Sequence, residues 1–197
     1  DIKTFTEILK EKGYFTKADV ISENIIPKRG FDEVGTFDEK STDFGDRHSE
    51  IIKKISDKEK FFLFLHYEGV HSRLMADIMK KYDPKNNEDE YFENIEENNN
   101  RYDSYLKDCD KYVQAIKKTI LEISKEKKII VIWFADHGTS TGERKGEKFY
   151  GVYTYDYTIN SFCMIEFPSK LNKVIDTQCS LLDFFPLMMN LSGGEQF

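Results

Sequence analysis

One apolar run that ends in a metal-competent turn constrains this chain more than any other stretch. The run extends from Ile129 to Ala135 and consists mainly of β-branched and aromatic residues. Such a run is typical of a strand buried on both faces of a parallel sheet. Asp136, His137 and Gly138 follow at once. The sequence therefore predicts a central strand whose carboxyl end, the edge at which α/β proteins bind ligands, carries a carboxylate and an imidazole.

Apolar segments and helical periodicity alternate along the rest of the chain. Four segments rich in β-branched and aromatic residues are predicted to be strands of one mostly parallel sheet: 14–21, 61–67, 129–135 and 161–167. Apolar residues recur every three or four positions from Tyr102 to Ile123, which predicts an amphipathic helix packed on a face of that sheet. We therefore expect an α/β fold with a mostly parallel sheet flanked by helices.

Shorter signals predict two more helices and one long connection. Thr4 and Glu7 have the spacing of a capping box, which predicts a helix over residues 5–12. A last helix is expected to begin near Thr177. The segment from Phe31 to His48 is rich in Asp and Glu and has no sustained period. We interpret it as a solvated connection and assign it no chemistry.

The size and charge of the chain limit its class. With 197 residues, of which 39% are apolar, the chain is long enough for one hydrophobic core, so we expect a single α/β domain over residues 1–197. Its net charge of −7 arises from interspersed acids and lysines, which argues against nucleic acid or an anionic membrane surface as a partner. No apolar run approaches the roughly 18 residues of a transmembrane helix, so the chain is expected to be soluble.

The cysteines give a weak indication of compartment. Cys109, Cys163 and Cys179 are an odd number, lie far apart and form no CxxC motif, which argues against both a disulfide framework and a zinc cluster. This favours a reducing, cytoplasmic compartment, although sequence ahead of Asp1 could carry an export signal.

Two further side chains are expected near the Asp136–His137 turn. A carboxylate and a neutral imidazole from one turn suit a divalent cation, although a helix cap followed by a structural histidine is the alternative interpretation. His71 follows the strand 61–67 and leaves the sheet at the same edge, although a histidine after a strand is often simply a polar residue whose hydrogen bonds are satisfied. Lys148 lies in a basic loop with Arg144 and could bind an anionic ester oxygen, whereas a simple surface turn is the commoner reason for such a loop.

With these residues in place, the chain resembles the sulfatase family of the alkaline phosphatase superfamily. The landmarks that carry the resemblance occur in the family's order: TFTEILKEKGYFT, the Gly-Phe-Asp at Gly30 to Asp32, FFLFLHYEGVHS, FADHGTSTGE after a long helix, and DTQCSLLDFFPLMMNLSG. The resemblance covers nearly the whole chain, and the ordered set is far more specific than Asp-His-Gly alone.

The resemblance implies a role for each candidate residue. Asp136 and His137 match positions that ligate the active-site metal, which is usually calcium in sulfatases and manganese, magnesium or zinc in relatives. His71 matches the histidine that contacts the transferred group and the leaving oxygen. Lys148 is the candidate for the lysine that binds the ester anion. The implied substrate is a small-molecule or glycan sulfate or phosphate ester.

The chain also departs from the family's pattern. The residue after Gly142–Glu143 is usually histidine in bacterial members and is Arg144 here, and Val70 replaces a proline before the His71 position. In family members, two segments lie upstream of the helix that corresponds to the one after Thr4. They are the first strand, which carries two metal-binding carboxylates, and the Cys/Ser-x-Pro-x-Arg segment, which carries the nucleophile. We therefore expect these residues to be the carboxyl-terminal part of a catalytic domain, inactive until the amino-terminal segment completes the site.

Three functions follow as hypotheses. The first is a metal-dependent hydrolase of sulfate esters, in which an upstream alkoxide attacks sulfur and His71 assists departure of the leaving group. The second is a phosphoglycerol or phosphoryl transferase, or a phosphodiesterase, of the same superfamily. The third is a non-catalytic binding module that keeps the fold and has lost the chemistry. Substrate identity and oligomeric state have no signal in the sequence.

Overall fold

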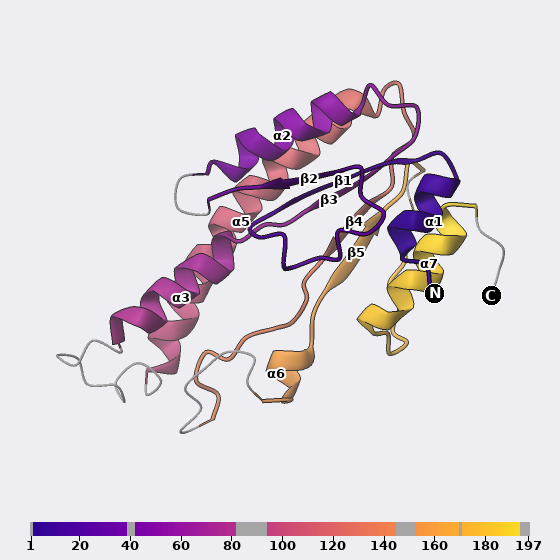
Figure 1. Cartoon of the computed structure of the whole chain (residues 1–197). Helices are drawn as coiled ribbons and strands as arrows, with labels where there is room; N and C mark the ends of the chain where they lie inside the picture. The colour runs from indigo at the N-terminus through magenta and orange to yellow at the C-terminus, as the bar shows by residue number, and fades with distance from the viewer. Residues whose placement is uncertain (1, 39–41, 82–93, 145–152, 170, 194–197) are drawn as a thin grey trace. The chain divides into compact units, whose positions relative to one another are not determined.

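The computed structural model of the chain describes residues 2–38, 42–81, 94–144, 153–169 and 171–193 (Figure 1). It contains two compact units. The first unit comprises Asp1–Tyr67, Thr119–Ile123 and Asn172–Phe197, and the second comprises Glu68–Lys118 and Ser124–Leu171.

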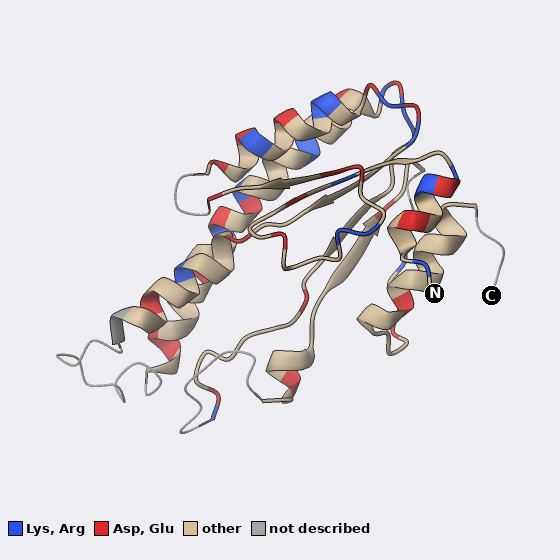
Figure 2. Ribbon diagram, in the orientation of Figure 1, with Lys and Arg blue, Asp and Glu red and all other residues tan. Residues whose placement is uncertain are grey.

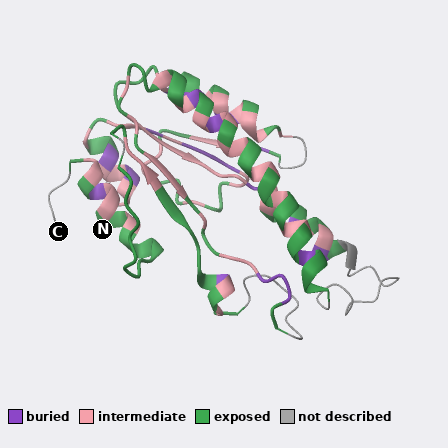
Figure 3. Ribbon diagram, turned by 180° about the vertical axis from the view of Figure 1, so that it is seen from behind, coloured by how far each residue is buried: buried purple, intermediate pink, exposed green. Residues whose placement is uncertain are grey.

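The first unit is built on a parallel sheet of three strands in the order β2-β1-β3. These strands are β1 (Phe15–Val20), β2 (Glu33–Thr36) and β3 (Phe61–Leu65). Both edges of β1 are paired, so that Lys17 lies opposite Glu33 on one side and Leu63 on the other. β1 is also the most deeply buried strand (Figure 3), because Thr16, Ala18, Asp19 and Val20 are almost completely enclosed.

Helices complete the first unit. They are α1 (Phe5–Glu11), α2 (Phe44–Ile55) and α7 (Phe184–Leu191), the last preceded by a 3-10 turn, η1 (Leu181–Asp183). Buried apolar side chains from the helices and β1 form the core: Leu9, Ala18, Val20, Ile52, Ile55 and Met189. The ring of Phe5 packs edge-on against Phe62 and Phe185, with centroids 5.5 and 6.4 Å apart, which ties α1 to both β3 and α7. Charges of both signs are interspersed along α2 (Figure 2).

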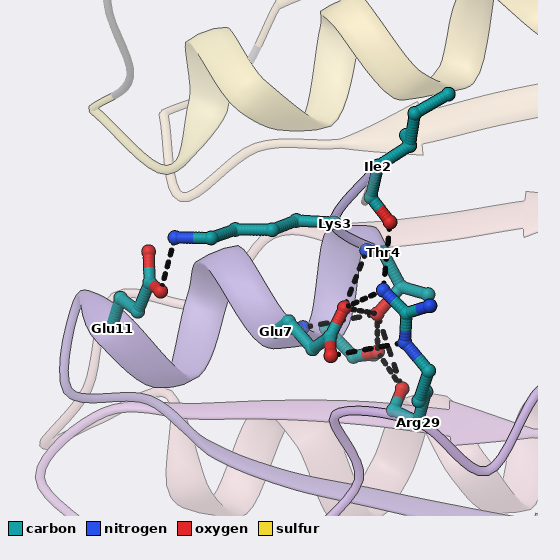
Figure 4. A network of polar contacts seen from close by, with 7 residues as sticks. Ile2, Lys3, Thr4, Glu7, Glu11 and Arg29 are labelled. Carbon is teal, nitrogen blue, oxygen red and sulfur yellow. Dashed lines mark hydrogen bonds and ion pairs between the residues drawn. The ribbon is translucent and has the colours of Figure 1, made fainter.

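A polar cluster locks the start of α1 to the loop before β2 (Figure 4). Thr4 and Glu7 form the capping box that the sequence predicted. The Glu7 carboxylate also accepts hydrogen bonds from Arg29 Nε at 3.0 Å and Nη2 at 2.6 Å. Hydrogen bonds from the Arg29 guanidinium and from Thr4 lower the pKa of Glu7 to about 2. The neighbouring Gly30 fits closely against α1, since a Cβ at this position would lie 2.4 Å from the Glu7 nitrogen.

We expect Gly30→Ala to destabilise the protein more than Gly13→Ala does. Both glycines have positive φ, +87° and +81°, so each alanine incurs a backbone cost of about 1–2 kcal/mol. Gly13 has no atom within 4 Å of its would-be Cβ, whereas Gly30 would also clash with backbone atoms of α1. The difference in unfolding free energy between the two variants, measured by urea unfolding, gives the cost of the clash at Gly30. Equal losses of unfolding free energy would contradict the close fit of this loop on α1.

The second unit contains α3 (Gly69–Lys81), most of α5 (Ile95–Ile123), β4 (Val131–Phe134), α6 (Asp156–Ile159) and β5 (Cys163–Glu166). Leu74, Ile78 and Ile116 are its buried apolar side chains among the residues described. The helices α3 and α5 are joined by an ion pair between Arg73 and Asp108 and by a hydrogen bond from Tyr105 to Asp77.

The strands β4 and β5 form an antiparallel pair in which Trp133 lies opposite Met164. Trp133 Nε1 donates to Glu166 Oε1 at 2.7 Å, and Lys117 of α5 makes an ion pair with the same oxygen at 3.0 Å. An ion pair therefore links Lys117 of α5 to the face of the strand pair that carries Trp133. On the opposite face, Phe134 and Cys163 are exposed.

The structure corrects the prediction of one sheet containing all four predicted strands. All four segments are strands, but within the described residues β4 pairs with β5 alone, and the pairing is antiparallel. The run 129–135 is thus neither central nor fully buried. A continuous apolar run shows that both faces of a strand are apolar, but it carries no information on whether both edges have hydrogen-bonding partners.

The helix predictions hold with changed limits. α1 is confirmed, α5 begins seven residues before Tyr102, and the last helix begins at Phe184 rather than near Thr177. The segment from Phe31 to His48 is not a plain connection, since it contains β2 and the first turn of α2. Helices with a parallel three-stranded sheet fit the α/β class. Within the described ranges, no helix is long and apolar enough to cross a membrane.

Candidate active site

The Asp136–His137–Gly138 turn is fixed on both sides by backbone hydrogen bonds. Before it, Ala135 N donates to Phe162 O at 3.2 Å, which extends the pairing of β4 with β5. After it, Gly138 N donates to Thr158 O of α6 at 2.7 Å. A Cβ on Gly138 would lie 2.2 Å from the carbonyl oxygen of Tyr157, a distance that no side chain allows. The glycine is therefore required by the close approach of α6, and the turn is held rigidly.

This turn places the Asp136 carboxylate beside the His137 ring. Asp136 Oδ1 accepts a hydrogen bond from the His137 backbone nitrogen at 2.9 Å, and Asp136 Oδ2 lies 3.6 Å from His137 Nε2. His137 Nδ1 is 2.6 Å from Gly138 O. A carbonyl oxygen can only accept, so Nδ1 is the donor in this contact, and when the ring is neutral its lone pair is on Nε2. Both side chains are exposed.

The pair fits a divalent cation. Two ligand atoms that are each ~2.1–2.4 Å from one ion, at an angle of about 90–110°, lie ~3.0–3.9 Å apart. The separation of 3.6 Å between Asp136 Oδ2 and His137 Nε2 falls in this range. The hydrogen bond at Nδ1 orients the ring in the way that backbone carbonyls orient metal-binding histidines. In the part of the chain that the structure describes, no group of three or more His, Cys, Asp or Glu residues could hold a metal, so the pair would need further ligands.

The loop after the turn is organised by Glu143. Its Oε2 accepts hydrogen bonds from Thr141 N at 2.8 Å, Gly142 N at 3.1 Å and Ser140 Oγ at 3.1 Å. Burial opposes ionisation, but these backbone and hydroxyl donors prevail and lower the pKa of the Glu143 carboxyl. Asn98 of α5, itself buried, donates to Thr141 O at 2.8 Å. Residues 140–142 are consequently a buried stretch of loop (Figure 3).

Of the other two candidate residues, the structure describes His71 but not Lys148. His71 lies in the first turn of α3 rather than on a loop, is exposed, and belongs to the same unit as Asp136. Its approach to the Asp136–His137 turn remains a prediction. Lys148 lies outside the described residues, so its role also remains a prediction.

Comparison with known protein families shows to which family the chain belongs. The sulfatase family model matches residues 1–194 of the chain. The chain belongs to the sulfatase family. The resemblance read from the sequence is thereby confirmed, and the family is one of hydrolases within the alkaline phosphatase superfamily. No curated protein matched the chain.

Sequence reasoning missed the residues that shape the loop of this sulfatase-family site. Ser140 and Glu143 have the Ser-x-x-Glu spacing of a capping box, a local signal that could have revealed the loop's carboxylate anchor. Asn98 had no such signal, because it lies 43 positions before the carbonyl that it binds. Its neighbours in sequence are Glu and Asn residues typical of a solvated segment.

Proposed function

We propose that this chain contributes to a metal-dependent hydrolase of sulfate esters, with Asp136 and His137 as metal ligands. The observation that carries the proposal is the 3.6 Å separation of Asp136 Oδ2 and His137 Nε2 on a rigid, exposed turn of a sulfatase-family chain. His71 would give a proton to the leaving oxygen, and Lys148 would bind the ester anion.

Each proposed residue has a separate physical task. The bound metal, with calcium first and manganese, magnesium or zinc as alternatives, would supply Lewis-acid stabilisation of charge on the ester oxygens. Asp136 contributes negative charge, which favours binding of a cation, and His137 contributes a nitrogen whose orientation is set through Gly138 O. The nucleophile and the remaining ligands would come from sequence ahead of Asp1, since no Cys/Ser-x-Pro-x-Arg segment occurs in residues 1–197.

Metal binding tests the ligand pair directly. Calcium prefers six to eight oxygen ligands, so the chain alone should bind it weakly, with a Kd of about 10⁻⁴ M or above. Asp136→Ala and His137→Ala should each weaken binding further, by about tenfold or more. The measurement is calorimetric titration with calcium and, in parallel, manganese.

A matched variant controls for the loss of any carboxylate. Asp103 is an exposed aspartate of α5, and Asp103→Ala should leave the affinity for both metals unchanged. Affinities that are the same in wild type, Asp136→Ala and His137→Ala would show that the turn is not the metal site, and the proposed function would then lose its main support.

A further inference from the structure

A ladder of tyrosine rings with a stacked arginine lies next to the Asp136–His137 turn. Its rings are Tyr153, Tyr155 and Tyr157, whose successive centroids are 5.8 and 5.6 Å apart with interplanar angles of 41° and 43°. The guanidinium carbon of Arg144 lies 3.7 Å from the Tyr155 ring centroid. We call these four residues the tyrosine–arginine platform.

Two features connect the platform to the turn. The backbone of Tyr157 is packed against Gly138, because the Tyr157 carbonyl oxygen occupies the space that a Cβ would need. Arg144 directly follows Glu143, whose carboxylate holds the loop that leaves the turn. The platform therefore begins beside the turn that carries the proposed metal ligands, at the backbone of Tyr157 and just after the loop that Glu143 holds.

The platform is only partly buried, since its rings Tyr155 and Tyr157 are half-buried. Tyr153 keeps 51% of its surface exposed, and Arg144 is also exposed. A tyrosine cluster that served only the core would be buried, since most of the stabilisation by an aromatic side chain comes from removing its surface from water. The stacked guanidinium has a second property. A guanidinium that stacks on a ring through its flat face keeps its N–H edge available, and this is the edge that binds carboxylate, sulfate or phosphate in a bidentate manner.

We propose that the tyrosine–arginine platform binds the organic part of the ester and that this part is a six-membered ring with a second anionic group. The negative faces of the tyrosine rings attract the C–H groups of a sugar or the edge of an aryl ring, while Arg144 pairs with the anion. This inference rests on the proposed function for its place in catalysis. It deepens that function, because it assigns a substrate class where the metal ligands select only the ester.

Binding of four small probes tests the platform without turnover. Galacturonate and benzoate each combine a ring with a carboxylate, whereas acetate has only the anion and galactose only the ring. We expect at least one ring carboxylate to bind at least tenfold more tightly than acetate and galactose, as measured by NMR chemical-shift titration in the presence of EDTA. Preference for galacturonate would indicate a glycan ester, and preference for benzoate an aryl ester.

Substitutions test whether the probes bind to the residues of the platform. Arg144→Gln and Tyr155→Leu should each weaken binding of the preferred probe at least tenfold, and Tyr155→Phe, which keeps the ring, should retain it. The matched control is Tyr14→Leu, which removes a tyrosine stacked with a different cation, Lys60, at 5.8 Å. It should bind as wild type does, and circular dichroism of every variant checks that the fold is kept.

The outcomes separate this inference from the proposed function. Equal binding of all four probes, or wild-type affinity in both Arg144→Gln and Tyr155→Leu, would overturn the platform even if calcium still binds through Asp136. Ring carboxylates that bind through the platform in a protein whose Asp136 and His137 hold no metal would support the platform and count against the proposed hydrolase.

Discussion

Asp136→Ala should lower turnover of a sulfate ester by at least about a thousandfold, because a metal's stabilisation of the transition state is worth several kcal/mol and each 1.36 kcal/mol is tenfold in rate. The reaction would be followed with an aryl sulfate and, in parallel, the corresponding aryl phosphate, each with calcium, manganese or zinc. The proposed function calls for a longer protein in this measurement, in which residues ahead of Asp1 supply the proposed nucleophile. The preferred ester distinguishes a sulfatase from the phosphoryl-transfer alternative.

The chain of residues 1–197 alone should show no saturable turnover of either ester. Binding and positioning without a nucleophile leave at most a residual rate. Asp103→Ala in the longer protein is the matched control and should keep wild-type kcat/KM. Two results would contradict this account. Turnover by residues 1–197 that disappears in Asp136→Ala would place the nucleophile within this sequence, and a longer protein that is folded but inert would favour a non-catalytic binding module.

Features with local causes were predictable from the sequence. The capping box of Thr4 and Glu7 needs only residues three positions apart, and it is present in the structure. The strands β1 and β3 likewise follow from apolar runs of strand-forming residues. The Asp136–His137–Gly138 turn was predicted for the same reason, since it directly follows such a run, and its role in binding a ligand stays a prediction. The reason for its glycine was not predictable, because the obstructing carbonyl belongs to Tyr157, nineteen positions later.

Features that depend on distant partners, or on where a segment is divided, were not predictable. Among the described residues β4 pairs with β5 alone, and which strand lies at each edge of another cannot be read from the side chains of either strand. The helix α2 was missed for a different reason. Its buried residues His48, Ile52 and Ile55 have helical spacing, but the acidic segment from Phe31 to His48 contains only the first of them, so that segment alone shows no helical period. Asp43, the actual helix cap, was counted as one more solvated acid.

The most consequential residues in that acidic segment are Arg47 and His48, which surround the buried Asp19 of β1. Asp19 is 1% exposed. Its carboxylate accepts hydrogen bonds from Arg47 Nε and Nη2, both at 2.7 Å, and lies 3.2 Å from His48 Nε2. A Cβ on Gly35 would come within 2.4 Å of Asp19 Oδ1, so β2 also encloses the carboxylate closely. Removing one partner of such a group leaves buried charge or polarity uncompensated.

We expect Asp19→Ala to destabilise the protein by about 3–5 kcal/mol, which is the usual loss when one partner of a buried ion pair is removed. Asp19→Asn keeps the shape of the side chain and removes its charge, so it isolates the contribution of ionisation. Burial opposes that ionisation, but the adjacent His48 and Arg47 side chains prevail and lower the pKa of Asp19 from 3.8 to about 2. A shift of this size corresponds to about 2 kcal/mol of stability.

The pH dependence of the difference between wild type and Asp19→Asn tests this cause. Because the folded pKa is depressed, the stabilisation by the carboxylate is fully present above pH 3.8 and is lost as the pH falls towards about 2. Urea unfolding from pH 7 to pH 2 should therefore show a gap in unfolding free energy that narrows by about 2 kcal/mol below pH 4. Other carboxylates with lowered pKa, such as Glu7 and Asp32, weaken both proteins equally in acid and cancel in the difference. A gap that stays constant across this range would mean that Asp19 stabilises the sheet through packing and hydrogen-bond geometry rather than through its charge.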